Sequence, residues 1–130
     1  MKQPAASSLN ILVADDIPLN LKIVSLMLRK LGHTGVLVPD GEQALRALEQ
    51  QRFDVVLMDA SMPVLDGLGA LKEIREAERR GRAHIPVIMV TGHDTPDDLQ
   101  NFLKAGANGF VPKPIQVEVL QRELQRVLKR

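Results

Sequence analysis

Apolar residues follow two different periods along the chain. Short continuous apolar runs alternate with segments in which apolar residues recur every three or four positions. Continuous runs are typical of strands that are buried on both faces of a parallel sheet, and several of them are rich in Val and Ile. The five strand-length runs cover Leu9–Ala14, Gly35–Val38, Phe53–Met58, Ile85–Thr91 and Gly109–Val111.

A segment with helical periodicity follows each of these runs. In the first one, Leu21, Val24 and Leu28 form an apolar stripe, and Pro18 suits the first helical turn. The sequence therefore predicts an α/β domain of five β-α units with an open, doubly wound sheet. The expected helices cover Pro18–Leu31, Gly41–Gln51, Gly67–Arg80, Pro96–Lys104 and a last one whose stripe runs from Val117 to Leu128.

Length and composition narrow the classes of function. The 130 residues fit one domain, expected at 9–130, and residues 1–8 are expected to be a flexible leader or an expression remnant. With 17 basic and 16 acidic residues there is no excess of positive charge for nucleic acid. The chain has no Cys, and its apolar stretches are far shorter than the roughly 18 residues of a membrane span. We expect neither direct nucleic-acid binding nor membrane contact from this domain.

Polar residues stand at the carboxyl ends of four of the predicted strands. Asp15 and Asp16 follow the first strand, Asp59 follows the third, Thr91 ends the fourth and Lys113 follows the fifth. A single Asp at such a place is usually a cap or turn residue, and a single Lys is usually solvated. In a parallel sheet, however, these ends lie along one edge, where such folds bind ligands.

Three crowded carboxylates repel one another unless a cation lies between them. Mg²⁺ suits such a site because it prefers carboxylates, waters and phosphate oxygens. Lys113 and the Thr91 hydroxyl would then suit two further phosphoryl oxygens, and an Asp carboxylate can act as the nucleophile toward phosphorus. The residues therefore predict Mg²⁺-dependent phosphoryl transfer to Asp59.

Four sequence pieces together resemble the receiver domains of two-component signalling. They are Ile-Leu-Val-Ala-Asp15-Asp16, Val-Leu-Met-Asp59-Ala-Ser-Met-Pro63-Val-Leu-Asp66-Gly67, Val-Thr91-Gly and Lys113-Pro114. The resemblance covers about residues 9–130. It implies a flavodoxin-like sheet of five parallel strands in the order 2-1-3-4-5 with five helices. It also implies that Asp59 receives a phosphoryl group from a phosphohistidine.

The resemblance assigns roles to individual residues. Asp59 matches the phosphoacceptor, Asp16 the direct metal ligand and Asp15 the second acidic residue, which often acts through water. The backbone carbonyl of Ser61 matches the remaining metal contact. The implied ion is Mg²⁺, with Mn²⁺ as an alternative. Lys113 matches the invariant lysine, and Pro114 a proline that often follows a cis peptide bond.

The resemblance also implies a switch. Thr91 matches the switch hydroxyl and Phe110 the aromatic switch residue, with a plain core residue as the alternative for Phe110. The fourth helix, fifth strand and fifth helix would present the state to a partner. Ser61 and His93 border the path of the hydrolytic water and are expected to tune the lifetime of the phosphorylated state, although His93 is equally well explained as a solvated residue.

Alternatives remain open. A phosphatase or phosphotransferase of the haloacid dehalogenase type normally needs a second Asp where this chain has Ser61. A nucleotide- or flavin-binding module would need a glycine-rich loop after the first strand, and a degenerate receiver would lack part of the acidic set. The partner is expected to be a histidine kinase or histidine phosphotransfer domain. We expect a cytoplasmic receiver of a hybrid sensor histidine kinase, whose other parts can lie in a membrane, or alternatively a stand-alone regulator.

Overall fold

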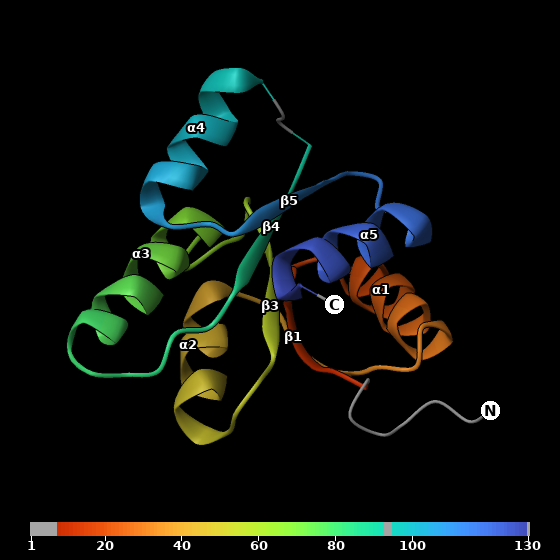
Figure 1. The fold of residues 1–130 in the computed structure, drawn as a ribbon, viewed down its shortest axis with the longest axis horizontal. Coiled ribbons are helices and arrows are strands. Elements are labelled where there is room, and N and C mark those ends of the chain that lie inside the picture. Colours follow the sequence, from red (N-terminus) through yellow and green to blue (C-terminus); the bar gives the residue numbers. More distant parts are fainter. Residues whose placement is uncertain (1–7, 93–94, 130) are drawn as a thin grey trace.

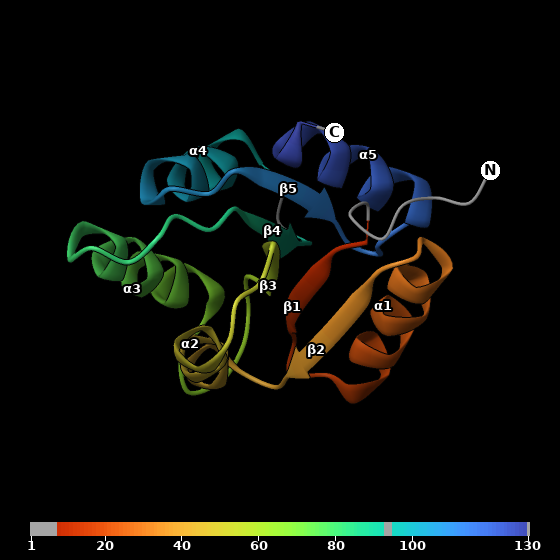
Figure 2. The same ribbon diagram turned by 60° about the horizontal axis from the view of Figure 1, so that its bottom comes forward.

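Five parallel strands form one sheet in the order β2-β1-β3-β4-β5, as predicted (Figure 1 and Figure 2). A computed structural model describes residues 8–92 and 95–129 of the chain. Residues 1–7 of the expected leader lie outside this range, whereas Ser8 donates a hydrogen bond to the Gly32 carbonyl at 2.8 Å. The strands are β1 (Asn10–Ala14), β2 (Thr34–Val38), β3 (Val55–Asp59), β4 (Val87–Thr91) and β5 (Gly109–Pro112).

Helices cover both faces of the sheet. Helices α2, α3 and α4 lie on one face, and α1 and α5 lie on the other (Figure 2). All bounds agree with the expected ones to within two residues. No helix in the described part of the chain is long and apolar enough to cross a bilayer. The helices are α1 (Pro18–Lys30), α2 (Gly41–Gln50), α3 (Gly67–Arg79), α4 (Pro96–Ala105) and α5 (Val117–Leu128).

The strands differ in burial. Every residue of β3 and β4 is buried, as the continuous apolar runs predict. In β2, by contrast, only Val38 is buried, and Leu37 is 39% exposed. The expectation of burial on both faces is therefore wrong for β2, because this strand lies at the edge of the sheet, where the flanking helices cover it incompletely.

The opposite edge of the sheet is closed by side chains of α5. Glu123 accepts the Phe110 N–H at 2.8 Å, and Arg126 donates to the Asn108 carbonyl at 2.9 Å. The hydrogen bond from Arg126 holds the pKa of Glu123 below its usual value, although burial opposes this shift. The outer face of β5 is thus occupied by a charged pair from the same chain.

Local capping positions the loop that follows β3. Asp66 caps α3, because its Oδ1 accepts the Gly69 N–H at 2.7 Å. Asp66 and Gly67 therefore lead from the loop after β3 into α3. A Cβ atom at Gly67 would overlap the backbone carbonyl of Asp59. Glycine at this position lets the start of α3 pack directly against the end of β3.

Candidate functional site

The carboxyl edge of the sheet brings Asp15, Asp16 and Asp59 together. Asp59 is the last residue of β3, and the neighbouring strand β1 ends one residue before Asp15. Because Ala14 pairs with Met58 in the parallel register, the next residue on each strand is an aspartate. One carboxylate oxygen of each of the three lies within 4.8 Å of the others.

Asp59 is the most deeply buried of the three, at 2% exposure. Its Oδ1 accepts a charged hydrogen bond from Lys113 Nζ at 2.8 Å and one from the Ser61 N–H at 3.2 Å. Its Oδ2 is the one buried side-chain polar atom without a hydrogen-bond partner among the described residues. A buried carboxylate oxygen without a partner is costly, so it is expected where a ligand completes its bonding.

Asp15 is also buried, and this raises the pKa of its carboxyl group above the usual value. The negative charge of Asp59 raises it further, whereas hydrogen bonds from the Ile17 N–H and the Asn20 side chain, together with the charge of Lys113, oppose the rise. The N–H of Ile17 lies 2.9 Å from Asp15 Oδ1. The site therefore disfavours a full set of negative charges.

Asn20 is a site neighbour that the sequence interpretation did not assign. Its side chain hydrogen-bonds to Asp15 and opposes the rise in the pKa of that carboxyl group. Asn20 is the third residue of α1, whose first turn starts directly beyond the end of β1. This position in the first turn after a strand-end Asp places Asn20 near the site, but the sequence does not specify the direction of its side chain.

Thr91 and Lys113 flank the acidic group from β4 and β5. Thr91 is the buried last residue of β4, and its carbonyl accepts the Lys113 N–H at 3.0 Å. This bond fixes the backbone from which the lysine side chain reaches Asp59. The peptide bond between Lys113 and Pro114 is cis, as the resemblance implied.

The structure describes the expected switch residue Phe110 and the expected lifetime residue Ser61. Phe110 is half-buried on β5, and its ring lies 6.1 Å from that of Phe102 in α4, tilted by 42°. Ser61 is exposed and follows Asp59 by two residues. His93 lies outside the described residues. The roles of these residues remain predictions.

The charges of the site fit a divalent cation. Three carboxylates and one ammonium sum to −2, since −3 and +1 leave two uncompensated negative charges. Hard divalent ions bind to carboxylate oxygens, and the partnerless Asp59 Oδ2 supplies a free one. The fold and this site define the class of the protein as a phosphoacceptor-type α/β domain with an acidic pocket.

Comparison with known proteins identifies the family. The profile described as "Response regulator receiver domain" matches residues 11–125. The chain therefore belongs to the response regulator receiver family of two-component signalling. It contains the acidic pocket that is typical of that family's phosphoacceptors.

Three relatives illustrate the range of this similarity. The chain is 38% identical over 115 residues to hybrid signal transduction histidine kinase I of Dictyostelium discoideum. This match covers 85% of the chain but only 7% of that relative. It is 34% identical to the chemotaxis protein CheY of Pseudomonas aeruginosa, over 94% of this chain and 98% of that one. The solved receiver domain of a Pseudomonas aeruginosa sensor histidine kinase, which has a magnesium ion coordinated in its active site cleft, is 42% identical with a TM-score of 0.81, covering 95% of this chain and 99% of that one.

Proposed function

We propose that Asp59 is the phosphoacceptor of this receiver domain and that Asp15, Asp16 and Asp59 hold the Mg²⁺ that the reaction needs. The observation that supports this most directly is how the two carboxylate oxygens of Asp59 are bonded. One of its oxygens is paired with Lys113, and the other is buried without a hydrogen-bond partner beside two further carboxylates.

In the proposed reaction, a carboxylate oxygen of Asp59 attacks the phosphorus atom of a phosphohistidine. A P–O bond forms, the P–N bond breaks, and the histidine nitrogen leaves with the electron pair and takes up a proton. The Lys113 ammonium, already 2.8 Å from Asp59, compensates negative charge on the phosphoryl oxygens. Bound Mg²⁺ would supply further charge compensation, and the backbone carbonyl of Ser61 is proposed as its additional ligand.

Incubation with acetyl phosphate and Mg²⁺, followed by intact mass measurement, tests this proposal. Wild type should gain one phosphoryl group, and chelation by EDTA should prevent the gain. Asp59→Asn should gain none. Asp66→Asn is the matched control, because Asp66 caps α3 and should leave phosphorylation intact. Undiminished uptake by Asp59→Asn would exclude Asp59 as the acceptor.

We also propose that Thr91 and Phe110 convert phosphorylation into a change on the α4–β5–α5 face. Thr91 is buried at the end of β4, and Phe110 connects both helices, since its ring contacts Phe102 of α4 and its N–H donates to Glu123 of α5. Thr91→Ala should still accept the phosphoryl group but should lose the spectral change of this face in amide NMR. Ser61 and His93 are proposed to set the dephosphorylation rate, which Ser61→Ala and His93→Ala would then alter.

The phosphoryl donor is proposed to be a histidine kinase or a histidine phosphotransfer protein, as for other receivers. The outer face of α1, next to the acidic site, supports docking of a helical domain. It exposes three apolar side chains, and α1 contains basic residues but no acidic one. The exposed apolar residues are Leu19, Ile23 and Leu26.

Phosphotransfer from a phosphohistidine protein, compared with labelling by acetyl phosphate, tests this docking face. Leu19→Ser should slow transfer from the protein donor and leave acetyl phosphate labelling unchanged. Leu103→Ser, at a leucine on α4 that is also exposed, is the control. Equal donor rates for wild type and Leu19→Ser would rule out this part of the α1 face.

We further propose that the chain is the receiver of a hybrid sensor histidine kinase in the cytoplasm. The 42% identity to a sensor-kinase receiver favours this over a stand-alone regulator, which remains the alternative given the full-length match to CheY. Sequencing the complete gene around this segment decides between the two hypotheses. A receiver of a hybrid sensor kinase requires a kinase core in the same open reading frame, whereas a stand-alone regulator does not.

A further inference from the structure

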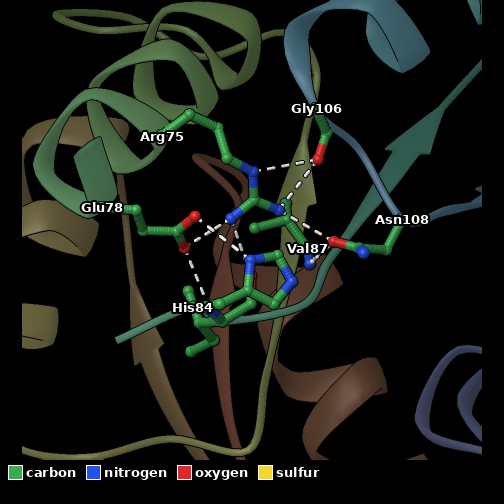
Figure 3. Close-up of polar contacts among 7 residues, drawn as sticks. Arg75, Glu78, His84, Val87, Gly106 and Asn108 are labelled. Atoms are coloured by element: carbon green, nitrogen blue, oxygen red, sulfur yellow. Dashed lines mark hydrogen bonds and ion pairs between the residues drawn. The ribbon is translucent and has the colours of Figure 1, made fainter. Parts of the chain in front are cut away.

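The end of α4 is held by one buried side chain, Arg75 of α3 (Figure 3). Its Nε and Nη2 donate to the Gly106 carbonyl at 3.0 and 2.8 Å, and Nη2 also donates to Asn108 Oδ1 at 2.8 Å. Gly106 is the C-cap residue of α4, in the left-handed region at φ 107°. A Cβ atom there would lie 2.8 Å from Arg75 Nε, so glycine lets the guanidinium approach the helix end.

Arg75 is itself fixed from the other side. Its Nη1 donates to Glu78 Oε2 at 2.6 Å and to the Ile85 carbonyl at 2.9 Å. Glu78 Oε2 also accepts the Ile85 N–H at 2.9 Å, and Asn108 Oδ1 also accepts the Val87 N–H at 2.9 Å. One network of charged and backbone groups therefore joins α3, the start of β4 and the turn between α4 and β5.

The other end of α4 is attached differently. In its first turn, Thr95 Oγ1 accepts the Asp98 N–H at 3.3 Å and donates to Asp98 Oδ2 at 2.8 Å. Among the described residues, the side-chain hydrogen bonds of this turn stay within the turn. The contacts of α4 with the core are apolar, made by buried Phe102 and partly buried Leu99. Apolar contacts can slide, whereas charged hydrogen bonds in a buried site must be broken to move.

We infer that Arg75 makes Gly106–Asn108 a fixed pivot, so that α4 moves by tilting about its C-terminal end. The N-terminal end of α4 begins at Pro96, five residues after Thr91, and is therefore the end next to the proposed phosphorylation site. The trigger in this mechanism rests on the proposed function, since a change at Asp59 would enter at the N-terminal end. The tilting motion itself is inferred only from the difference between the two ends of α4.

Amide hydrogen exchange measured residue by residue tests the pivot without any phosphorylation. In wild type, the N–H groups of Ala107 and Asn108, bonded to the Phe102 and Val87 carbonyls at 2.9 and 2.8 Å, should exchange more slowly than those of the first turn. Arg75→Gln should accelerate them on the order of tenfold to a hundredfold relative to the amides of β1 and β3. Arg79→Gln, one turn further along α3 and exposed, should change nothing.

The Arg75 Nε–H resonance of wild type provides a measurement that needs no variant. It should be protected from exchange and should keep its chemical shift when acetyl phosphate and Mg²⁺ are added. In the same titration, backbone shifts should change at Thr95–Leu99 and fade toward Gly106. Changes at Gly106–Asn108 as large as those in the first turn, or an Arg75→Gln variant with wild-type exchange at Ala107, would overturn the pivot.

Intact mass measured on the same samples separates the two claims. If Asp59 gains no phosphoryl group, the proposed function fails, while the exchange pattern of the unmodified protein still decides whether Arg75 fixes the end of α4. If Asp59 is modified and the end of α4 moves as a whole, the pivot fails and the phosphoacceptor assignment stands.

Discussion

Two charged clusters lie at opposite ends of this sheet, and they differ in how completely their charged groups are bonded within the chain. At the end where β4 begins, every partner of the Arg75 guanidinium is in place: one carboxylate, one amide oxygen and two backbone carbonyls. At the carboxyl edge, three carboxylates share one lysine, and Asp59 Oδ2 has no hydrogen-bond partner. Both clusters contain buried charged groups, although Asp16 of the acidic cluster is exposed, so the burial of a charge alone does not distinguish a structural cluster from a functional one.

What distinguishes the structural cluster from the functional one is whether all hydrogen bonds of its charged groups are made within the chain. A charge whose hydrogen bonds are all made within the chain has nothing left to offer a ligand, and its removal mainly affects stability. A cluster with excess charge of one sign is destabilising by itself and gains stability when a cation or a phosphoryl group arrives. The contrast leads to predictions that treat the clusters separately.

Removal of the Arg75 side chain should have the largest effect on stability. Arg75→Met leaves the Glu78 carboxylate and the Gly106 carbonyl without their charged donor, and should lower the free energy of unfolding by about 3–5 kcal/mol. Urea denaturation measures this change. Arg79→Met, which removes an exposed ion pair from the same helix, should cost less than about 1 kcal/mol. Similar losses for the two variants would show that the buried network contributes no more to the free energy of unfolding than an exposed ion pair does.

Addition of Mg²⁺ should stabilise the protein through the acidic cluster alone. At a hundredfold excess over the dissociation constant, the gain should be about 2.7 kcal/mol, because the ion binds only to the folded state. Asp16→Asn should lose most of this gain, whereas an Arg75 variant that folds should retain it in full. Denaturation with Mg²⁺ and with EDTA measures the difference, and a gain that Asp16→Asn shares would place the ion elsewhere.

The smallest effect, and one of opposite sign, is expected from Asp15→Asn without metal. Because the folded protein raises the pKa of Asp15 above its usual value, mainly through burial, it holds this proton more tightly than the unfolded chain does. The free energy of unfolding therefore falls as the pH rises from the usual pKa of an Asp carboxyl group to the raised pKa of Asp15, and it stays lower at higher pH. The variant removes this fall and should be more stable at neutral pH by roughly 1 kcal/mol.

Denaturation in EDTA between pH 4 and pH 7 measures the effect of Asp15→Asn. Parallel curves for wild type and variant would show that the Asp15 charge carries no cost in the folded protein. The order of stability should reverse in saturating Mg²⁺, because only the wild-type carboxylate contributes to the cation site.

The sequence predicted the acidic cluster but not the arginine cluster, and the reason is geometric. Parallel strands bring their carboxyl ends to one edge, so residues far apart in sequence, such as Asp15 and Asp59, can be placed together from the strand pattern alone. Residue type alone predicts that Arg75 is solvated like the other charged residues of its helix, because charged side chains are rarely buried. It stands four residues after Leu71 and seven after Leu68, on the apolar stripe, and this spacing was the available signal.

The exposure of β2 and the contact of Asn20 with Asp15 were also beyond the sequence pattern. An apolar run predicts a strand but not its place in the sheet, and edge strands keep apolar residues that solvent can reach. Side-chain hydrogen bonds such as that of Asn20 depend on the direction in which α1 leaves the sheet. Local spacing does not specify that direction.

The closed edge of the sheet has a consequence for association between chains. Within Gly109–Pro112, the Phe110 N–H faces away from β4 and is taken by Glu123, and Pro112, two residues on and on the same side, has no N–H to donate. An incoming strand would find no backbone donor there, so β5 resists the edge-to-edge pairing from which aggregates grow. Any additional strand has to join at β2, which makes the sheet extendable in one direction only.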